Sequence, residues 1–218
     1  GHEVILVSSG AIGLGMGKLG LRERPKDTPG KQACAAVGQC ELMYLYDNLF
    51  AEYSITVAQM LLTKYILLED RRKNVENAME RLIAHGVIPI INENDTVAID
   101  ELELEVGEND SLAATVAAIA KADLLIIMSD IDGLYDKDPH TYDDARLIPV
   151  VHEITDDIRA LAGGAGTTLG TGGMITKLNA VEIAYDSDID VVLMNGQHPK
   201  TLYDLFDGKT VGTFFCKK

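Results

Sequence analysis

The sequence predicts an α/β fold: a three-layer α/β/α sandwich around a mostly parallel central sheet. Short apolar runs rich in β-branched residues alternate, along almost the whole chain, with longer segments whose apolar residues recur at helical spacing. Such alternation is typical of a parallel sheet covered by helices. Polar residues also follow several of the expected strands directly, at the edge of the sheet where ligands bind in folds of this class.

The individual elements follow from apolar periodicity and from residues that start or stop helices. Residues 4–7 form the first expected strand, and a glycine-spaced helical stretch follows it. Gly86 can end the helix expected at 71–85, and the strand at 87–91 tolerates Pro89 where no ladder N–H is needed. The other expected elements are helices at 31–53, 110–120, 155–161, 171–185 and 201–206, strands at 56–62, 124–128 (fully buried) and 191–194, and an exposed hairpin at 97–106.

The composition is that of a globular protein, and the length allows either one large domain or a compact pair of lobes. The chain has 218 residues, 47% of them hydrophobic and 24% charged, which is enough to bury a substantial core. The formal net charge of −15 argues against a nucleic-acid partner, whose binding needs clustered Lys and Arg. The longest apolar runs are too short to span a membrane and no signal peptide is recognisable, so we expect a cytoplasmic protein that binds no membrane.

The three cysteines, Cys34, Cys40 and Cys216, are odd in number and form no C-x-x-C pair. A disulfide framework and a zinc site are therefore not expected, and no residue is assigned as a metal ligand. Cys34 and Cys40 fall within the apolar pattern of the helix at 31–53, which predicts that both are packing residues.

Four polar clusters stand at the expected strand ends or helix starts. Residues 8–11 offer hydroxyls and a glycine, which suit an anion as well as an ordinary helix N-cap. Residues 92–96 are consecutive polar residues after a buried strand, and we favour a ligand cleft there over an acidic turn. Residues 107–111 repeat the pattern, with helix capping as the stronger alternative. Residues 129–135 have the acidic spacing of a calcium loop, but Leu134 stands at a ligand position, so a nucleotide-facing loop is the better interpretation.

The strongest local signal is the glycine-rich segment 163–177, which leads directly into a helix carrying Lys177. Free backbone N–H groups, little Cβ bulk and one cation are what a phosphate site needs. The alternative is a linker, but linkers rarely lead into an amphipathic helix. The segment is not a Walker A motif. A literal G-x-G-x-x-G at residues 15–20 begins too far past Val7 for a dinucleotide fold, and we expect it to end a helix.

Together these segments resemble the motifs of the glutamate 5-kinases, a branch of the amino acid kinase family, and they occur in the order found there. The resemblance extends from Val4 to Phe215. Related branches carry Gly-Gly-Gly where this chain has Ser8-Ser9-Gly10, which makes the assignment to the branch specific. The matching segments are residues 7–12, 35–39, 91–95, 107–110, 129–135 and 170–177.

The resemblance implies ATP-dependent phosphorylation of the side-chain carboxylate of L-glutamate to L-glutamyl 5-phosphate, the first step of proline biosynthesis, with ATP and Mg²⁺ as cofactors. It implies a single amino acid kinase domain in which residues 1–120 bind glutamate and residues 121–218 bind ATP. Lys177 would be the catalytic cation, and Asp110 would orient it. The substrate-binding residues would be Ser9, Gly10, Asn92, Asp95 and Asn109, and the ATP-binding residues would be Ser129, Asp130, Thr171, Gly172, Gly173, Met174, Ile175, Thr176 and Lys177.

Members of this family usually self-associate and are restrained by proline, so a homo-oligomer with proline as feedback inhibitor is expected. They begin with a strand carrying a Lys-x-Gly-Ser/Thr motif, and many carry a C-terminal PUA domain; neither is found between Gly1 and Lys218. That lysine also contacts phosphate in the family, so we expect little activity from the chain as printed. Two alternatives stay open: a non-catalytic sensor of glutamate or proline, and a kinase of the same fold with another small acceptor.

Overall fold

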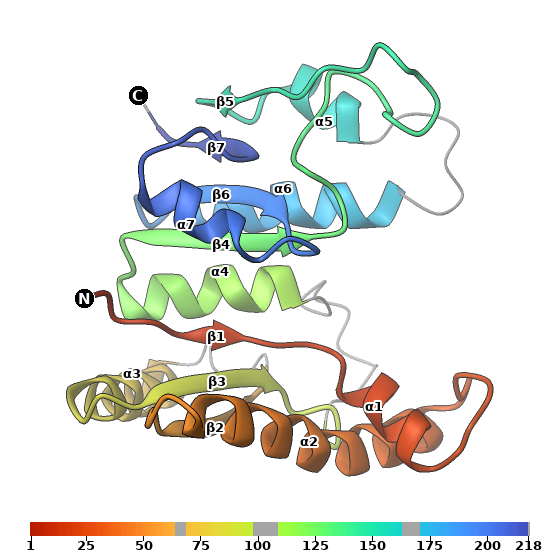
Figure 1. Cartoon of the computed structure of the whole chain (residues 1–218), viewed down its shortest axis with the longest axis vertical. Helices are drawn as coiled ribbons and strands as arrows, with labels where there is room; N and C mark the ends of the chain where they lie inside the picture. Colours follow the sequence, from red (N-terminus) through yellow and green to blue (C-terminus); the bar gives the residue numbers. More distant parts are fainter. Residues whose placement is uncertain (64–68, 98–108, 163–170, 218) are drawn as a thin grey trace. The chain divides into compact units, whose positions relative to one another are not determined.

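The computed structural model describes residues 1–63, 69–97, 109–162 and 171–217. They form two compact units, Gly1–Asn109 and Asp110–Lys218, and each unit has its own sheet (Figure 1). The sequence suggested a division near residue 120, at the end of the helix that begins at Asn109. The expected hairpin, apart from its first residue, and residues 163–170 of the glycine-rich segment lie outside the described residues.

Unit 1 holds a three-stranded, parallel sheet in the order β1-β3-β2. Helix α2 packs on β2 and α3 packs on β3. Parallel neighbours must be joined by long crossovers, and these two helices provide them. The elements are β1 (Leu6–Val7), α1 (Ala11–Lys18), α2 (Thr28–Ala51), β2 (Val57–Leu62), α3 (Glu69–Ala84) and β3 (Ile88–Glu93).

The helix ends in unit 1 follow from local chemistry. Helix α2 begins at Thr28, earlier than expected, because the carboxylate of Asp27 accepts a hydrogen bond from the N–H of Gly30 at 2.9 Å and caps the first turn. Helix α3 ends before Gly86, whose φ of 69° is left-handed, as the sequence predicted. Residues 15–20 end α1, also as predicted.

Pro89 stands in β3, the central strand of the unit 1 sheet. The N–H of Ile88 donates to the carbonyl of Thr56 on the β2 side. Because successive N–H groups of a strand alternate in direction, the ring nitrogen of Pro89 faces the β1 side. The pairing with β1 begins only at Ile90, opposite Leu6. Pro89 therefore removes no ladder hydrogen bond, as expected.

Helix α1 lies directly against α2 because two glycines remove side-chain bulk at their contact. A Cβ atom on Gly15 would stand 1.8 Å from the carbonyl oxygen of Cys34, and one on Gly38 would stand 1.7 Å from that of Ala11. Cys34 and Ala11 are both buried there. The contact fixes the start of α1, and it therefore holds the preceding loop, residues 8–10, close to α2.

Unit 2 holds a four-stranded sheet in the order β4-β6-β7-β5. The β4–β6 and β5–β7 pairs are parallel and the β6–β7 pair is antiparallel. Helix α6 packs on β6 and α5 packs on α6. The elements are α4 (Asn109–Ala120, whose first residue is counted with unit 1), β4 (Leu124–Ser129), β5 (Val150–Val151), α5 (Asp156–Ala162), α6 (Thr171–Tyr185), β6 (Asp190–Asn195), α7 (Thr201–Phe206) and β7 (Thr213–Phe215).

The core of unit 2 is built around α6 and the strands beside it. Ala180, Val181 and Ala184 of α6 are at most 1% exposed, and so are Val191 and Leu193 of β6. Small residues on the helix let it approach the strand closely. Burying each branched apolar side chain contributes about 1.5–3 kcal/mol relative to exposure, so this contact anchors the C-terminal half of α6.

The structure confirms the predicted fold class, since both units are α/β with mostly parallel pairing. Strands β5 and β7 were not expected, because two or three residues are too few to give a periodic signal. Two expectations of burial were wrong. Cys40 is exposed while Cys34 is buried, because six positions along a helix turn a side chain to about 240° around the axis. Met128 is 42% exposed, so β4 is not fully buried.

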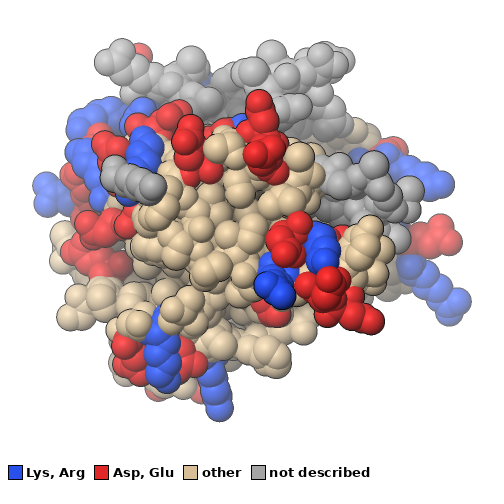
Figure 2. All heavy atoms as spheres, turned by 90° about the horizontal axis from the view of Figure 1, so that it is seen from above, with Lys and Arg blue, Asp and Glu red and all other residues tan. Residues whose placement is uncertain are grey.

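On the face of the molecule seen in Figure 2, acidic and basic side chains are interspersed around uncharged surface. Among the residues drawn in colour, the basic side chains form no continuous patch on that face. In the part of the chain that the structure describes, no helix is both long and apolar enough to cross a membrane.

We predict that Gly38→Ala lowers the free energy of unfolding by about 3 kcal/mol, because the new methyl group would overlap the backbone of α1. Gly13→Ala is the matched control, since Gly13 lies in α1 and a Cβ there would meet nothing within 4 Å. It should raise the free energy of unfolding by about 0.5–1 kcal/mol. Urea unfolding measures both; equal effects of the two substitutions would contradict the close contact.

Candidate active site

In unit 1, polar residues gather at the carboxyl ends of β1 and β3. Val7 pairs with Ile91, and the N–H of Ser8 donates to the carbonyl of Ile91 at 2.8 Å, so the residues after both strands reach the same edge. Ser8 is buried, whereas Ser9 and Gly10 are exposed. Gly10 has a φ of 101°, a left-handed conformation that lets the chain turn sharply into α1.

Hydrogen bonds to Ser8 connect this edge to other elements. The Ser8 hydroxyl lies 2.9 Å from the hydroxyl of Tyr46 on α2 and donates to the carbonyl of Ser9 at 3.3 Å. The Ser8 carbonyl accepts a hydrogen bond from Nδ2 of Asn109 at 3.4 Å. The structure thus brings three of the predicted substrate-binding residues, Ser9, Gly10 and Asn109, to one loop. Ser8, which the sequence did not single out from its neighbours, contacts Tyr46 through its hydroxyl group and Asn109 through its carbonyl group.

Asn92, at the end of β3, belongs to a buried network of amides. Its Oδ1 accepts from the backbone N–H of Glu93 at 2.9 Å, and its Nδ2 donates to Oε1 of Gln39 on α2 at 3.0 Å. Asn92 is 3% exposed and Gln39 is 8% exposed. The Nε2 of Gln39 has no hydrogen-bond partner among the described residues. A buried donor left unpaired costs about 1–3 kcal/mol.

Gln39 was not among the predicted site residues. The signal that could have found it is a glutamine on the apolar face of a long helix, where a buried amide needs partners. Gln39 also ends the segment 35–39 that carries part of the family resemblance.

Asp95 lies half-buried in the turn after β3. Burial raises the pKa of its carboxyl group above the ordinary range for aspartate, and the positive charge of Arg24 opposes part of that rise. The turn is tied to the neighbouring strand because the N–H of Asn94 donates to the carbonyl of Leu62 at 2.7 Å. A carboxylate in this position can receive an ammonium group, whereas the amides nearby can donate to a carboxylate.

In unit 2, the carboxyl ends of β4 and β6 form the corresponding edge. Ser129 pairs with Asn195, and the N–H of Gly196 donates to the carbonyl of Ser129 at 2.7 Å. The Ser129 hydroxyl donates to Oδ1 of Asp130 at 3.0 Å. Asp130 is exposed and Ser129 is partly exposed. The two residues predicted to bind ATP through the loop after β4 therefore stand together at the ligand edge of their sheet.

Two further polar residues reach the same edge. Oδ1 of Asp132 accepts from Nδ2 of Asn195 at 2.8 Å, and Oδ2 accepts from the hydroxyl of Tyr135 at 3.1 Å. These bonds link the loop after β4 to the end of β6. Asn195 was not singled out from the sequence, although a lone asparagine directly after an apolar strand has the same polar-after-strand pattern as Asn92.

Lys177 and Asp110 form an ion pair, with Nζ of the lysine 2.9 Å from Oδ2 of the aspartate. Their side chains are 15% and 23% exposed. Lys177 lies in α6 and Asp110 lies in the first turn of α4, where the helix dipole favours a negative charge. The ammonium group has three donors. Asp110 therefore fixes the position of the cation and still leaves donors for another anion.

The predicted ATP-binding residues before Lys177 form the first turns of α6, which begins at Thr171, with Gly172 as its second residue. A Cβ on Gly173 would meet nothing within 4 Å, so the helix is open there. The Thr176 hydroxyl donates to the carbonyl of Gly173 at 2.9 Å, Ile175 is 38% exposed, and Met174 packs against the core of unit 2. The unpaired N–H groups of a helix start can receive phosphate oxygens.

Comparison with known proteins matches residues 1–195 to the model of the amino acid kinase family. The chain belongs to the amino acid kinase family. It is 51% identical, over an alignment of 221 residues, to the glutamate 5-kinase of Clostridium perfringens, covering 100% of this chain and 82% of that one. It is 54% identical over 216 residues to the glutamate 5-kinase of Clostridium tetani, covering 99% of this chain and 80% of that one.

Solved structures of other amino acid kinase-like enzymes share the fold. Carbamate kinase from Giardia lamblia, bound to AMP-PNP, aligns with a TM-score of 0.64 at 19% identity and covers 100% of this chain and 84% of that one. Isopentenyl phosphate kinase of T. acidophilum, in a product complex, aligns with a TM-score of 0.62 at 20% identity over 97% and 83% of the two chains. At these identities the likeness shows the fold alone.

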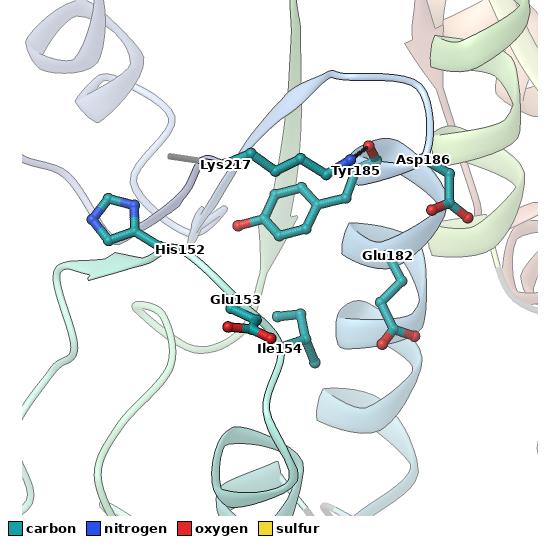
Figure 3. Close-up of a pocket in the computed structure, with 7 residues that line it drawn as sticks. All are labelled: His152, Glu153, Ile154, Glu182, Tyr185, Asp186 and Lys217. Atoms are coloured by element: carbon teal, nitrogen blue, oxygen red, sulfur yellow. Dashed lines mark hydrogen bonds between the residues drawn. The ribbon is translucent and has the colours of Figure 1, made fainter.

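Unit 2 of this amino acid kinase also has an open pocket of about 670 Å³ at the C-terminal end of α6 (Figure 3). No predicted site residue lines it. Two of the charged side chains that line it have partners: Glu182 pairs with Arg159, and Nζ of Lys217 donates to the carbonyl of Tyr185. The pocket is lined by His152, Glu153, Ile154, Glu182, Tyr185, Asp186 and Lys217.

Tyr185 contributes to the free energy of unfolding of this amino acid kinase, and this contribution is lost at alkaline pH. Its hydroxyl donates to the carbonyl of Val151 at 2.9 Å, and burial raises its pKa to about 12. Because the folded pKa exceeds the ordinary tyrosine value of about 10, the contribution of the neutral phenol is complete below about pH 10. It is lost as the pH rises toward 12.

We predict that Tyr185→Phe lowers the free energy of unfolding by about 1 kcal/mol at neutral pH and reduces the further loss above pH 10. Urea unfolding at neutral and alkaline pH measures both effects. Tyr203→Phe is the control, since Tyr203 is 76% exposed, and it should change neither. An unchanged alkaline loss in Tyr185→Phe would contradict the assignment.

Proposed function

We propose that this chain transfers the γ-phosphoryl group of ATP to the side-chain carboxylate of L-glutamate, forming L-glutamyl 5-phosphate and ADP, the first step of proline biosynthesis. The observation that carries the proposal is the identity of about half of all residues, along the whole chain, with enzymes named glutamate 5-kinase. The polar edges of the two units supply groups of the right chemistry.

The acceptor is assigned to unit 1, with Ser9, Gly10, Asn92, Asp95 and Asn109 as its binding residues. Asp95 is suited to the ammonium group of glutamate because it is an acidic side chain held in a partly dry turn. Asn92 and Asn109 carry amide N–H groups that suit the carboxylates. Together these groups match an acidic amino acid, which has one ammonium and two carboxylate groups.

ATP is assigned to unit 2, with Ser129, Asp130 and residues 171–177 around it. Lys177 would neutralise charge that develops on the transferring phosphoryl group, and Asp110 would hold its ammonium group in place through their ion pair. The start of α6 would receive phosphate oxygens on its backbone N–H groups. The glycines of this segment would keep Cβ atoms away from the phosphates.

The reaction needs positioning and charge neutralisation more than acid–base chemistry. A bond forms between a carboxylate oxygen of glutamate and the γ-phosphorus, and the bond from that phosphorus to the bridging oxygen breaks, so that ADP leaves. Glutamate is already ionised at neutral pH, and no general base is required. Lys177 serves the transition state because negative charge is spread over the phosphoryl oxygens as the bonds change.

Mg²⁺ is proposed to arrive with ATP, where it would neutralise part of the negative charge of the phosphates. In kinase sites Mg²⁺ is held mainly by phosphate oxygens and water, with only one or two carboxylates. The part of the chain that the structure describes offers no group of three or more His, Cys, Asp or Glu arranged as metal ligands. We also propose cytoplasmic location, self-association and feedback inhibition by proline.

Trapping with hydroxylamine tests the reaction, since an acyl phosphate is converted to a stable hydroxamate. The protein encoded by its natural gene, including any residues before Gly1, should give hydroxamate that depends on both ATP and L-glutamate. Binding of glutamate or proline without any product would favour a non-catalytic sensor. Product with another small acceptor but not with glutamate would favour a kinase of the same fold and different specificity.

We predict that Lys177→Ala lowers kcat by about 10²–10³-fold, because one group that stabilises the transition state is removed, while glutamate still binds. Lys209→Ala is the matched control. Lys209 also forms an ion pair, with Asp204 at 2.5 Å, but its side chain is 64% exposed. The control should keep full activity. Survival of activity in Lys177→Ala would show that this lysine is not the cation in question.

We predict that the KM for glutamate rises as the pH falls. The rise should begin at a higher pH than it would if the aspartate had an ordinary pKa. Asp95 has a raised pKa because it is buried, so it becomes neutral early on acidification and then loses its attraction for the ammonium group. In Asp95→Asn the KM should be high at every pH and nearly independent of pH.

The same raised pKa means that the ionised form of Asp95 is disfavoured by folding, so its unfavourable contribution grows as the pH rises through the raised pKa. Asp95→Asn should therefore be at least as stable as the unmodified chain at neutral pH. Asp47→Asn, an exposed aspartate on α2, is the control for both measurements. A KM for glutamate in Asp95→Asn equal to that of the control would show that Asp95 does not bind the acceptor.

A further inference from the structure

Gln39 is a buried polar residue to which the proposed mechanism gives no role. It lies in α2, is 8% exposed, and is the last residue of the segment 35–39 that resembles other family members. Its neighbour Gly38 is the position at which α2 contacts the start of α1. Gln39 therefore stands where α2, the loop after β1 and the end of β3 come together.

The orientation of the Gln39 amide follows from its neighbours. The backbone N–H of Glu93 can only donate, so Oδ1 of Asn92 must face it, at 2.9 Å. Nδ2 of Asn92 then points toward Gln39 and requires an acceptor, which is Oε1 at 3.0 Å. Turning the Gln39 amide over would bring two NH₂ groups together. The chain of bonds thus fixes each amide in one orientation.

This arrangement leaves one donor without an acceptor. Nε2 of Gln39 is enclosed and has no hydrogen-bond partner among the described residues. An apolar side chain of similar size would avoid the unpaired donor, so stability alone does not explain a glutamine here. What the glutamine provides is the oxygen that holds Asn92. Asn92 uses one Nδ2 hydrogen for this contact. Among the described residues, no hydrogen bond uses its second Nδ2 hydrogen.

We propose that Gln39 is a positioning residue for the acceptor, which acts through Asn92 and keeps the second Nδ2 hydrogen of Asn92 ready for a carboxylate oxygen of the amino acid. The inference rests on the proposed function and assigns to it a residue outside the predicted site. It accounts for a buried amide whose unpaired donor would otherwise only destabilise the fold. Gln39 itself does not touch the reacting atoms.

The test is a double-mutant cycle in the full-length protein. Gln39→Met keeps the length of the side chain and removes the oxygen. It should raise the KM for glutamate about tenfold, the loss of roughly one good hydrogen bond. The KM for ATP should stay within about twofold and kcat within about threefold. Asn92→Ala should raise the KM for glutamate at least as much. In the Asn92→Ala protein, adding Gln39→Met should raise the KM for glutamate by less than a further factor of about two, because Gln39 acts through Asn92.

Two further variants separate positioning from a merely structural role. Gln39→Glu keeps an oxygen that can accept from Asn92, and a buried carboxyl group tends to remain protonated, so the KM for glutamate should return to within about threefold of the unmodified protein. Gln59→Met makes the same change as Gln39→Met at an exposed position on β2, and it should leave the kinetics unchanged. If Gln39→Met does not fold, Gln39→Leu, which also removes the oxygen, takes its place in the cycle.

A KM for glutamate that is unchanged in Gln39→Met would overturn the proposal, and so would additive effects of Gln39→Met and Asn92→Ala. A tenfold or larger rise in Gln39→Glu would overturn it as well. Failure of the proposed function has a different outcome, because the unmodified protein would then form no glutamate-dependent product at all.

Discussion

The parallel register of β1 with β3 and of β4 with β6 governs where the proposed functional groups lie. Val7 stands opposite Ile91, and Ser129 stands opposite Asn195. In each pair both strands run in the same direction, so their following residues meet at one edge of the sheet. A slip of one residue would turn every side chain of a strand to the other face, and it would separate the polar residues that follow the strands.

The groups at these edges are held at some expense of stability. Asp95 is an acid whose charge is disfavoured by burial, and the buried Nε2 of Gln39 has no hydrogen-bond partner among the described residues. Proteins store such unfavourable features at functional sites, where the surrounding fold can support them. In unit 1 the support comes from the glycine contact between α1 and α2 and from the sheet. In unit 2 it comes from the core around α6, which places Lys177 beside Asp110.

Much of this could be predicted from the sequence because the signals are local. The α/β alternation, the polar residues after strands and the left-handed Gly86 are all read from neighbouring residues. Pairings between distant residues could not be read in this way. The bond from Asn92 to Gln39 joins positions 53 residues apart, and that from Lys177 to Asp110 joins positions 67 apart. The family resemblance suggested a link between Lys177 and Asp110, but only the fold brought Gln39 to Asn92.

The transfer of oxygen between substrate and phosphate tests the central claim most directly. L-glutamate labelled with ¹⁸O in its side-chain carboxylate is incubated with unlabelled ATP and the protein, and the acyl phosphate is then cleaved with hydroxylamine. If a carboxylate oxygen attacks the γ-phosphorus, attack of hydroxylamine at the carbonyl carbon releases phosphate that contains one ¹⁸O atom. Mass spectrometry should detect this labelled phosphate. Phosphate released without ¹⁸O would mean that ATP is hydrolysed by water, and it would contradict phosphoryl transfer to glutamate.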